Sequence, residues 1–149
     1  MLYSKYCEYS IRALSYLYAC ARREKYVMVK EISEKTNIPH HFLSKIFQDL
    51  ANTDWVISKK GKNGGFTMAV DGKQIKLMDI IKWSDGDQSL KKCVIGGDNE
   101  CGRDDRCLMH HRCSELRNQI MSFFETMSLY DVAEMNPQFD IKELLVKQD

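Results

Sequence analysis

The chain has 149 residues and a net charge of only +1, since 22 Lys or Arg are balanced by 21 Asp or Glu. This size is typical of one domain, or of a small domain with an appended arm. Its first 25 residues lack the features of a signal peptide, and no stretch of about 18 apolar residues could cross a membrane. We therefore expect a cytoplasmic protein with no membrane partner, whose six cysteines serve metal or redox chemistry rather than a disulfide framework.

The first 51 residues predict three helices. Residues 3–21 carry apolar side chains at three- and four-residue steps, and residues 27–37 repeat this pattern over a shorter length. Pro39 marks the start of a third helix over 40–51, because proline is tolerated in the first helical turn. The buried face of this third helix is expected to carry Leu43, Ile46, Phe47 and Leu50.

The next segment changes from a helical period to a strand period. Residues 55–58 and 66–70 are strand-like, and the lysine- and glycine-rich segment between them predicts a β-hairpin with a basic tip. Gly64 and Gly65 allow positive φ angles in that turn. A further helix is expected over 75–86.

Roughly 25 residues between Gly86 and His110 show no periodicity, which is typical of a functional loop or of disorder. After this loop, large apolar side chains recur at steps of four, three, four and three along a helix of about 20 residues. Such a seam is more than a short chain can cover alone, so it predicts a two-fold homodimer. The seam consists of Leu116, Ile120, Phe123, Met127 and Tyr130.

Two short helices across a tight turn, followed by a basic hairpin, are typical of a winged helix–turn–helix that binds DNA. Residues 1–84 hold 14 Lys or Arg against 8 Asp or Glu, which agrees with a polyanionic partner. The polar side chains that should face DNA from the third helix are His40, His41, Ser44, Lys45 and Gln48. In the wing, the expected DNA contacts are Lys59, Lys60, Lys62, Gly64 and Gly65. A solvated amphipathic helix beside an ordinary hairpin explains the same pattern without DNA.

Four cysteines and two histidines lie between Cys93 and Cys113. Their spacing lacks the C-x2-4-C knuckle of structural zinc sites and the C-x-x-C of thioredoxins. It favours an iron–sulfur cluster over zinc, or over thiols that form disulfides on oxidation, because a cluster needs thiolates spread around it. If Cys107 and His110 share the first helical turn, they could hold one iron while Cys93 and Cys101 hold the other.

The chain resembles the bacterial winged-helix regulators that include the iron–sulfur biogenesis regulator IscR and the nitric-oxide-sensing repressor NsrR. The resemblance covers most of the chain. It rests on "YSIRALSYLY", "EISEKTNIPHHFLSKIFQDL", "SKKGKNGGFTMA" and the three cysteines before a long helix. It implies a homodimer that crosses over through the long helix, with a cluster near the dimer interface that tunes affinity for DNA.

The resemblance also implies a set of ligands. Cys93, Cys101 and Cys107 match the family's three cysteine ligands, and His110 matches the histidine that completes a 2Fe–2S site in IscR-like members. NsrR-like members lack this histidine, bind 4Fe–4S, and take an acidic ligand from the partner's first helix, where Glu8 is the matching position.

Three features depart from the family pattern. The gap before the second cysteine is longer than in IscR, which affects the path of the loop. Lys60 stands where many members have Arg, and Arg fits a narrow minor groove better than Lys. Cys113 has no counterpart and is an alternative ligand, whereas Cys7 and Cys20 are expected to be small buried hydrophobic residues.

We therefore predict a mainly α protein with a small β-hairpin wing. Its expected parts are a winged helix–turn–helix domain over 1–84, a cluster-binding loop over 85–112, and a dimerisation helix with a C-terminal tail over 113–149. The predicted function is a transcriptional repressor of palindromic operators. An iron–sulfur cluster, 2Fe–2S rather than 4Fe–4S, would control its DNA affinity in response to redox state, nitric oxide or iron–sulfur status.

Two other functions remain open from the sequence. One is a module that stores or transfers metal or clusters without binding DNA, and the other is a regulator based on zinc or on thiols alone. No nucleotide- or flavin-binding fingerprint supports an enzyme, and no small-molecule substrate is expected.

Overall fold

The computed structural model describes residues 3–21, 26–87, 89–91, 93 and 109–135. The helices are α1 (Lys5–Ala21), α2 (Val29–Thr36), α3 (His40–Leu50), α4 (Leu77–Asp85), α5 (His110–Thr126) and α6 (Leu129–Met135). Strands β1 (Val56–Lys59) and β2 (Gly65–Met68) form an antiparallel hairpin, and short 3-10 helices η1 (Gly72–Gln74) and η2 (Ser89–Lys91) flank α4. This mainly helical fold with one hairpin confirms the predicted fold class. None of the helices in these segments is long and apolar enough to cross a membrane.

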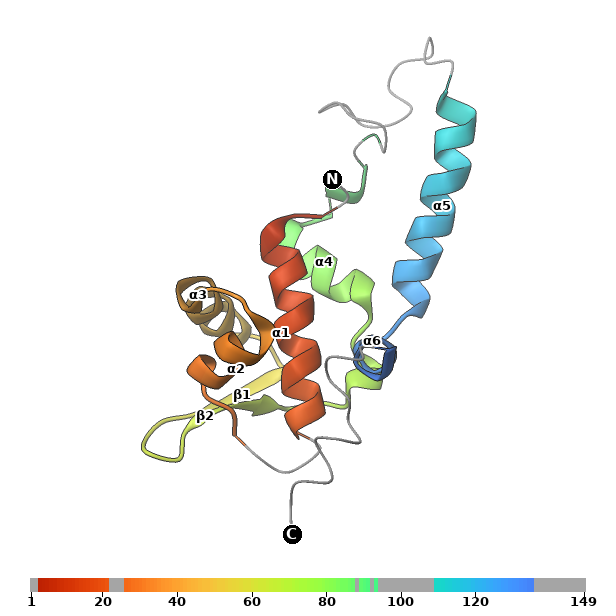
Figure 1. The fold of residues 1–149 in the computed structure, drawn as a ribbon. Coiled ribbons are helices and arrows are strands. Elements are labelled where there is room, and N and C mark those ends of the chain that lie inside the picture. The colour runs from red at the N-terminus through yellow and green to blue at the C-terminus, as the bar shows by residue number, and fades with distance from the viewer. Residues whose placement is uncertain (1–2, 22–25, 88, 92, 94–108, 136–149) are drawn as a thin grey trace.

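Helix α1 lies at the centre of the molecule, with α2, α3 and the hairpin on one side and α4, α5 and α6 on the other (Figure 1). Every residue from 13 to 20 is buried, and Ala13, Leu14 and Leu17 are fully so. A helix that is covered on all sides needs neighbours all round it, and α1 contacts α2, α3, β2, α4 and α6. Burying each leucine side chain stabilises the fold by roughly 1.5–3 kcal/mol, so the leucines of α1 contribute strongly to the stability of the core.

The helix–turn–helix forms where the sequence predicted it. Helix α2 ends at Asn37, which adopts the left-handed conformation with φ 52° and ψ 37°, and asparagine tolerates this conformation better than most residues. Pro39 then precedes α3, and the Ser33 hydroxyl donates a hydrogen bond to the Ile38 carbonyl at 2.7 Å, which closes the turn. The four side chains predicted for the buried face of α3 are all fully buried: Leu43, Ile46, Phe47 and Leu50.

The hairpin is attached to the rest of the domain through Phe66. The backbone N–H of Val27 donates to the Phe66 carbonyl, and that of Phe66 donates to the Val27 carbonyl, each at 2.8 Å. The Phe66 ring also packs against Phe47 of α3, with 4.7 Å between ring centroids. The wing is therefore held in a fixed relation to the segment before α2 and to α3.

The long C-terminal helix is shorter than predicted. Helix α5 ends at Thr126, and Met127 leaves the helical conformation with φ −70° and ψ 126°. The backbone N–H of Leu77 donates to the Met127 carbonyl at 3.0 Å, and that of Leu129 donates to the Ile75 carbonyl at 2.8 Å. This pairing with the segment before α4 ends the helix, so the prediction of one helix through Tyr130 is wrong.

A separate capping motif starts α6. The Ser128 backbone N–H donates to the Asp131 carboxylate at 2.8 Å, and the Asp131 N–H donates to the Ser128 hydroxyl at 3.2 Å. Met127 and Tyr130 are partly buried against the core. Ile120 of α5 is also partly buried against the core, so Leu116 and Phe123 are the members of the predicted seam that stay exposed.

Replacing Gly65 with alanine should loosen the wing. Gly65 has φ +138°, and a Cβ there would lie 2.5 Å from the Val27 carbonyl oxygen. Gly61→Ala is the matched control, since φ is +106° there but a Cβ would meet no atom of the described residues within 4 Å. We expect Gly61→Ala to lower the free energy of unfolding by about 1 kcal/mol and Gly65→Ala by about 2–4 kcal/mol. Denaturant titration measures both losses, and equal losses would contradict the close approach of Gly65 to Val27.

Candidate DNA interface and metal centre

The predicted DNA-reading residues lie on the side of α3 that faces away from the core. Gln48, Lys45, His41 and His40 are exposed, and Ser44 is half-buried. The Ser44 hydroxyl and the His40 Nδ1 share a hydrogen bond of 3.2 Å across one helical turn. Helix α3 therefore presents hydrogen-bonding side chains to an approaching ligand while its apolar side chains are in the core.

A groove of about 600 Å³ separates α3 from the hairpin. Its polar lining from α3 and the wing consists of His40, Ser44, Gln48, Ser58, Lys59 and Lys60. Gly64 and Gly65 also line it, although Gly64 is buried and Gly65 is half-buried. Lys30 of α2 lines the groove as well. Nothing in the sequence singles out Lys30, because a lysine near the start of an amphipathic helix carries no signal of its own.

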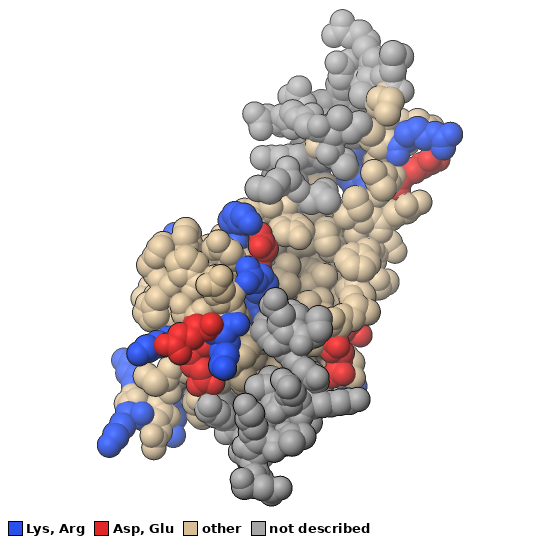
Figure 2. Space-filling view, in the orientation of Figure 1, with Lys and Arg blue, Asp and Glu red and all other residues tan. Residues whose placement is uncertain are grey.

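The wing brings positive charge to the edge of this groove. Lys59, Lys60 and Lys62 are all exposed, and Figure 2 shows Lys and Arg side chains projecting at the hairpin end of the molecule. The Lys59 ammonium lies 5.4 Å from the centroid of the Tyr26 ring, a separation at which a cation–π attraction operates. Exposed ammonium groups of this kind attract phosphates.

The flank of α3 opposite the wing is tied to α1 and α4. The Tyr6 hydroxyl donates to the Asp49 carboxylate at 2.5 Å. The Tyr6 ring also packs on Trp83 of α4 at 5.8 Å between centroids, and Trp83 packs on Trp55 at 6.0 Å. Burial, with the hydrogen bond to Asp49, raises the pKa of Tyr6 above its ordinary value. The hydroxyl thus stays protonated at neutral pH and can hold α3 in place.

Two of the four predicted cluster ligands fall within the described residues. Cys93 is half-buried two residues after η2, and His110 is half-buried at the start of α5. Cys101 and Cys107 lie outside the described residues. Within the described part of the chain, no three His, Cys, Asp or Glu side chains come together as a metal site. The complete ligand set therefore stays a prediction.

The described residues near His110 fit a negatively charged group. Cys113 and Arg117 follow His110 on the same side of α5, at one and two helical turns. The Nε and Nη2 atoms of Arg117 are buried and have no hydrogen-bond partner among the residues that the structure describes. In a 2Fe–2S cluster on three thiolates, the sulfides and thiolates outweigh two ferric ions, so the group is an anion. Two buried N–H donors without a partner are suited to lie near such an anion.

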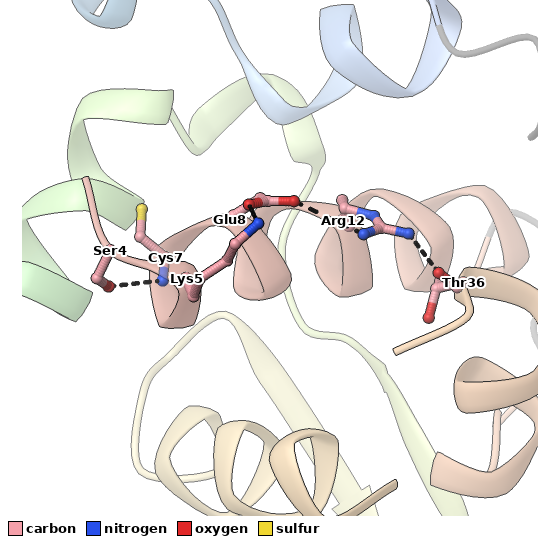
Figure 3. A network of polar contacts seen from close by, with 6 residues as sticks. All are labelled: Ser4, Lys5, Cys7, Glu8, Arg12 and Thr36. Carbon is pink, nitrogen blue, oxygen red and sulfur yellow. Dashed lines mark hydrogen bonds and ion pairs between the residues drawn. The ribbon is translucent and has the colours of Figure 1, made fainter. Parts of the chain in front are cut away.

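Glu8, the alternative ligand, belongs to a chain of polar contacts on α1 (Figure 3). Its carboxylate lies 2.7 Å from the Lys5 ammonium and 3.7 Å from Nη1 of Arg12. The Arg12 guanidinium also donates to the carbonyl of Thr36, the last residue of α2. One arginine thus links Glu8 to the turn before α3, a role that nothing in the sequence pattern of α1 indicated.

The three other cysteines that the structure describes are all buried. Cys7 and Cys20 are buried in the core, which confirms their prediction as small buried residues. Burial raises the pKa of the Cys7 thiol to about 11, which leaves little of the reactive thiolate at neutral pH. Cys113 is buried on the inner side of α5, and its role as an alternative ligand is not tested by the described residues.

Comparisons with known proteins agree with this geometry. The family model described as Rrf2, an iron-dependent transcriptional regulator, matches residues 3–135. A protein of Aquifex aeolicus described as an HTH-type transcriptional regulator is 32% identical over 134 residues, which cover 89% of this chain and 91% of that protein. The HTH-type transcriptional regulator NsrR of Geobacillus kaustophilus is 27% identical over 134 residues, or 90% of each chain.

Solved structures show the same fold. CymR, described as the global cysteine regulator of B. subtilis, has a TM-score of 0.69 at 22% identity, over 89% of this chain and 96% of that chain. IscR of T. potens has a TM-score of 0.63 at 21% identity, over 89% of this chain and 90% of that chain. The winged-helix fold of this chain is therefore shared with both of these regulators.

Proposed function

Because the chain belongs to the Rrf2 family of iron-dependent transcriptional regulators, we propose that it is a repressor whose affinity for DNA follows the state of an iron–sulfur cluster. One observation carries the DNA-binding part of this proposal. The groove between α3 and the wing brings the hydrogen-bonding side chains of α3 beside lysines of the wing. Such a regulator works in the bacterial cytoplasm, where it meets DNA and where thiols stay reduced.

The two sides of the groove have different tasks on DNA. Helix α3 enters the major groove, where Gln48 can pair with adenine through two hydrogen bonds and Ser44 can reach a neighbouring base. The lysines of the wing contact phosphates or the minor groove, which positions the protein without reading sequence. The hydrogen bond between Tyr6 and Asp49 holds α3 at the angle that this reading needs.

A second copy of the chain is the proposed partner of α5. Leu116 and Phe123 lie two turns apart on one side of this helix and remain 49% and 51% exposed. Figure 2 shows the visible flank along α5 as largely uncharged between charged groups near its ends. Exposed apolar side chains in a row are typical of an interface. A two-fold interface here would present both α3 helices to one palindromic site.

The proposed cluster is held by Cys93, Cys101, Cys107 and His110, which supply four ligands from one chain. When bound, the cluster supplies iron that oxidants and nitric oxide attack and that iron scarcity removes. Its ligands come from the segment after α4 and from α5, so they tie these two elements together. A cluster of the 4Fe–4S type would require Glu8 of the partner subunit, and Glu8 would then give up its pairing with Arg12.

The start of α1 can pass this change to the DNA-binding half. The Ser4 N–H and hydroxyl donate to the Asp85 carboxylate at the end of α4, at 2.6 and 2.5 Å. Tyr6, in the first turn of α1, donates a hydrogen bond to Asp49 of α3. If α4 shifts when the cluster is lost, the position of α3 on the core would therefore change. The cluster changes DNA affinity only through its different affinity for the two arrangements.

A thiol-based regulator without a cluster is the second candidate. The fold is as similar to that of CymR, described as a cysteine regulator, as to that of IscR. The metal content of the protein distinguishes these two candidates, and DNA binding separates both from a storage or transfer module.

Purification without oxygen tests the cofactor. We expect coloured protein with two irons and two sulfides per chain, because Cys93, Cys101, Cys107 and His110 form a complete set. Cys107→Ala should be colourless, whereas the control Cys20→Ala, which changes a buried core residue of α1, should keep its iron. Visible spectra with iron and sulfide assays measure this. Colourless wild type with one zinc, or with no metal, contradicts the proposal, and four irons per chain favour the Glu8-assisted site.

One substitution in α3 and one in the wing should have different effects on DNA binding. Gln48→Ala should relax sequence preference and cost about 1–3 kcal/mol on the preferred site, because it removes contacts to a base edge. Lys62→Ala should weaken all sites alike and reduce the salt slope by about one, because it removes a phosphate contact. Selection from a random DNA pool at several salt concentrations measures both. If the wild type enriches no palindrome, or if both variants lose specificity equally, this division of tasks is wrong.

Replacing both Leu116 and Phe123 with glutamate should give monomers, since the change places charges in the proposed two-fold interface. The control is Asn118→Glu, an exposed position on another side of α5. Sedimentation velocity should show dimers for the wild type and the control and monomers for the double variant. A monomeric wild type, or a dimeric double variant, would exclude an interface on this face.

A further inference from the structure

Phe42, in the first turn of α3, departs from the apolar pattern of its helix. It is 42% exposed, whereas the four other large apolar side chains of α3 are fully buried. A single exposed apolar side chain is common on protein surfaces and has no meaning by itself. The contacts of this ring and its place on the helix, however, distinguish it from a side chain that is free in solvent.

The Phe42 ring is held between two other rings. Tyr9 of α1 packs edge-on against it, with 5.6 Å between ring centroids, and the His41 ring lies 4.3 Å away on α3 itself. Tyr9 is in turn partly buried against the core. Edge-to-face contacts between rings are attractive, so Phe42 is fixed in one orientation before any ligand arrives. A side chain that is ordered in advance loses little entropy on binding.

Phe42 also borders the side of α3 that faces away from the core. His41 precedes it and Lys45 follows three residues later, at a neighbouring position on the helix surface, and both are exposed. In a helix–turn–helix, the N-terminal residues of the second helix meet the edges of bases in the major groove. An apolar ring in the first turn of α3 would therefore approach the bases together with these polar side chains.

The major groove has one apolar group that such a ring can recognise. Every base pair presents hydrogen-bond donors and acceptors there, but only thymine adds a methyl group, and phenylalanine is among the residues that contact it. Ser44 and Gln48 recognise donors and acceptors, so neither of them detects this methyl group. Phe42 thus complements the polar residues of α3 with a contact that they cannot make.

We propose that Phe42 is a specificity-determining residue, which packs its ring against the 5-methyl group of a thymine in each half of the operator. This inference rests on the proposed function, because the contact exists only when α3 lies in the major groove. It adds to that function the kind of base pair that the first turn of α3 selects.

Uracil substitution in the selected operator tests this contact directly. Uracil pairs with adenine as thymine does and lacks only the methyl group. Replacing each thymine in turn, in both half-sites together, should reveal one position where the wild type binds roughly tenfold more weakly, because two buried methyl groups are lost. Phe42→Ala should bind the thymine and uracil forms of that operator equally. Fluorescence anisotropy at fixed salt measures each pair of affinities.

Two further variants separate this contact from a general loss of affinity. Phe42→Leu, which keeps an apolar side chain, should retain part of the preference for thymine. Ile57→Ala removes an apolar side chain of β1 that is 47% exposed, and it should keep the full preference, because the wing does not meet the methyl group. Each ratio compares two DNAs bound by the same protein, so any change in stability affects both affinities alike.

The outcomes distinguish this inference from the proposed function. If the wild type selects a palindrome in which no thymine is sensitive to uracil, or if Phe42→Ala keeps the sensitivity, the role of Phe42 is wrong while DNA binding stands. If the wild type selects no DNA sequence at all, the proposed function fails as well.

Discussion

The complete burial of α1 is the constraint on which the rest of the molecule depends. Residues 13–20 are covered on every side, by α2, α3 and β2 from the DNA-binding half and by α4 and α6 from the other half. A core packed this closely cannot deform gradually, so a displacement on one side has to be met by a discrete shift on the other. In the proposed regulator, α1 is thus the route by which cluster loss would reach α3.

Polar contacts in the first half of α1 join this helix to α4 and to the helix–turn–helix. Ser4 caps the helix by accepting a hydrogen bond from the Cys7 N–H at 3.1 Å while it binds Asp85 of α4. Further along, Tyr6 binds Asp49 and Arg12 binds the Thr36 carbonyl. The end of α2 and the last turn of α3 therefore each receive a contact from α1, which also contacts α4, and each contact is local enough to be tested by a single substitution.

The sequence was sufficient to predict elements whose signals are local. The buried face of α3 follows from a 3.6-residue period, and the wing follows from paired glycines between strand-like segments. The end of α5 depends on backbone bonds between Met127 and Leu77, which are far apart in the chain. Its only local sign was the spacing of Ser128 and Asp131, which is typical of a helix N-terminus. The apolar pattern continues past Ser128, so it predicted a C-terminal helix that was too long.

The candidate site, like the fold, can be predicted from the sequence only in part. The residue types and spacing near Cys93 and His110 predict soft metal ligands, which stay a prediction, and the exposed polar residues of α3 follow from its buried face. Arg117 could not be singled out in this way, because an arginine within an amphipathic helix is normally expected to be exposed. Only the folded chain shows that its Nε and Nη2 atoms are buried without a hydrogen-bond partner among the described residues. Residues that act through burial or through distant partners therefore require the structure.

The control of DNA binding by the cluster is tested most directly by the affinity of one anaerobic preparation for a selected palindromic DNA. The affinity would be measured at fixed salt before and after the iron is removed with a chelator. We expect the two dissociation constants to differ by at least about fivefold, the lower range of typical coupling between sites. Cys107→Ala should show the iron-free value throughout. Equal affinities of the coloured and the colourless wild type, with both dimeric, would contradict control of DNA binding by the cluster.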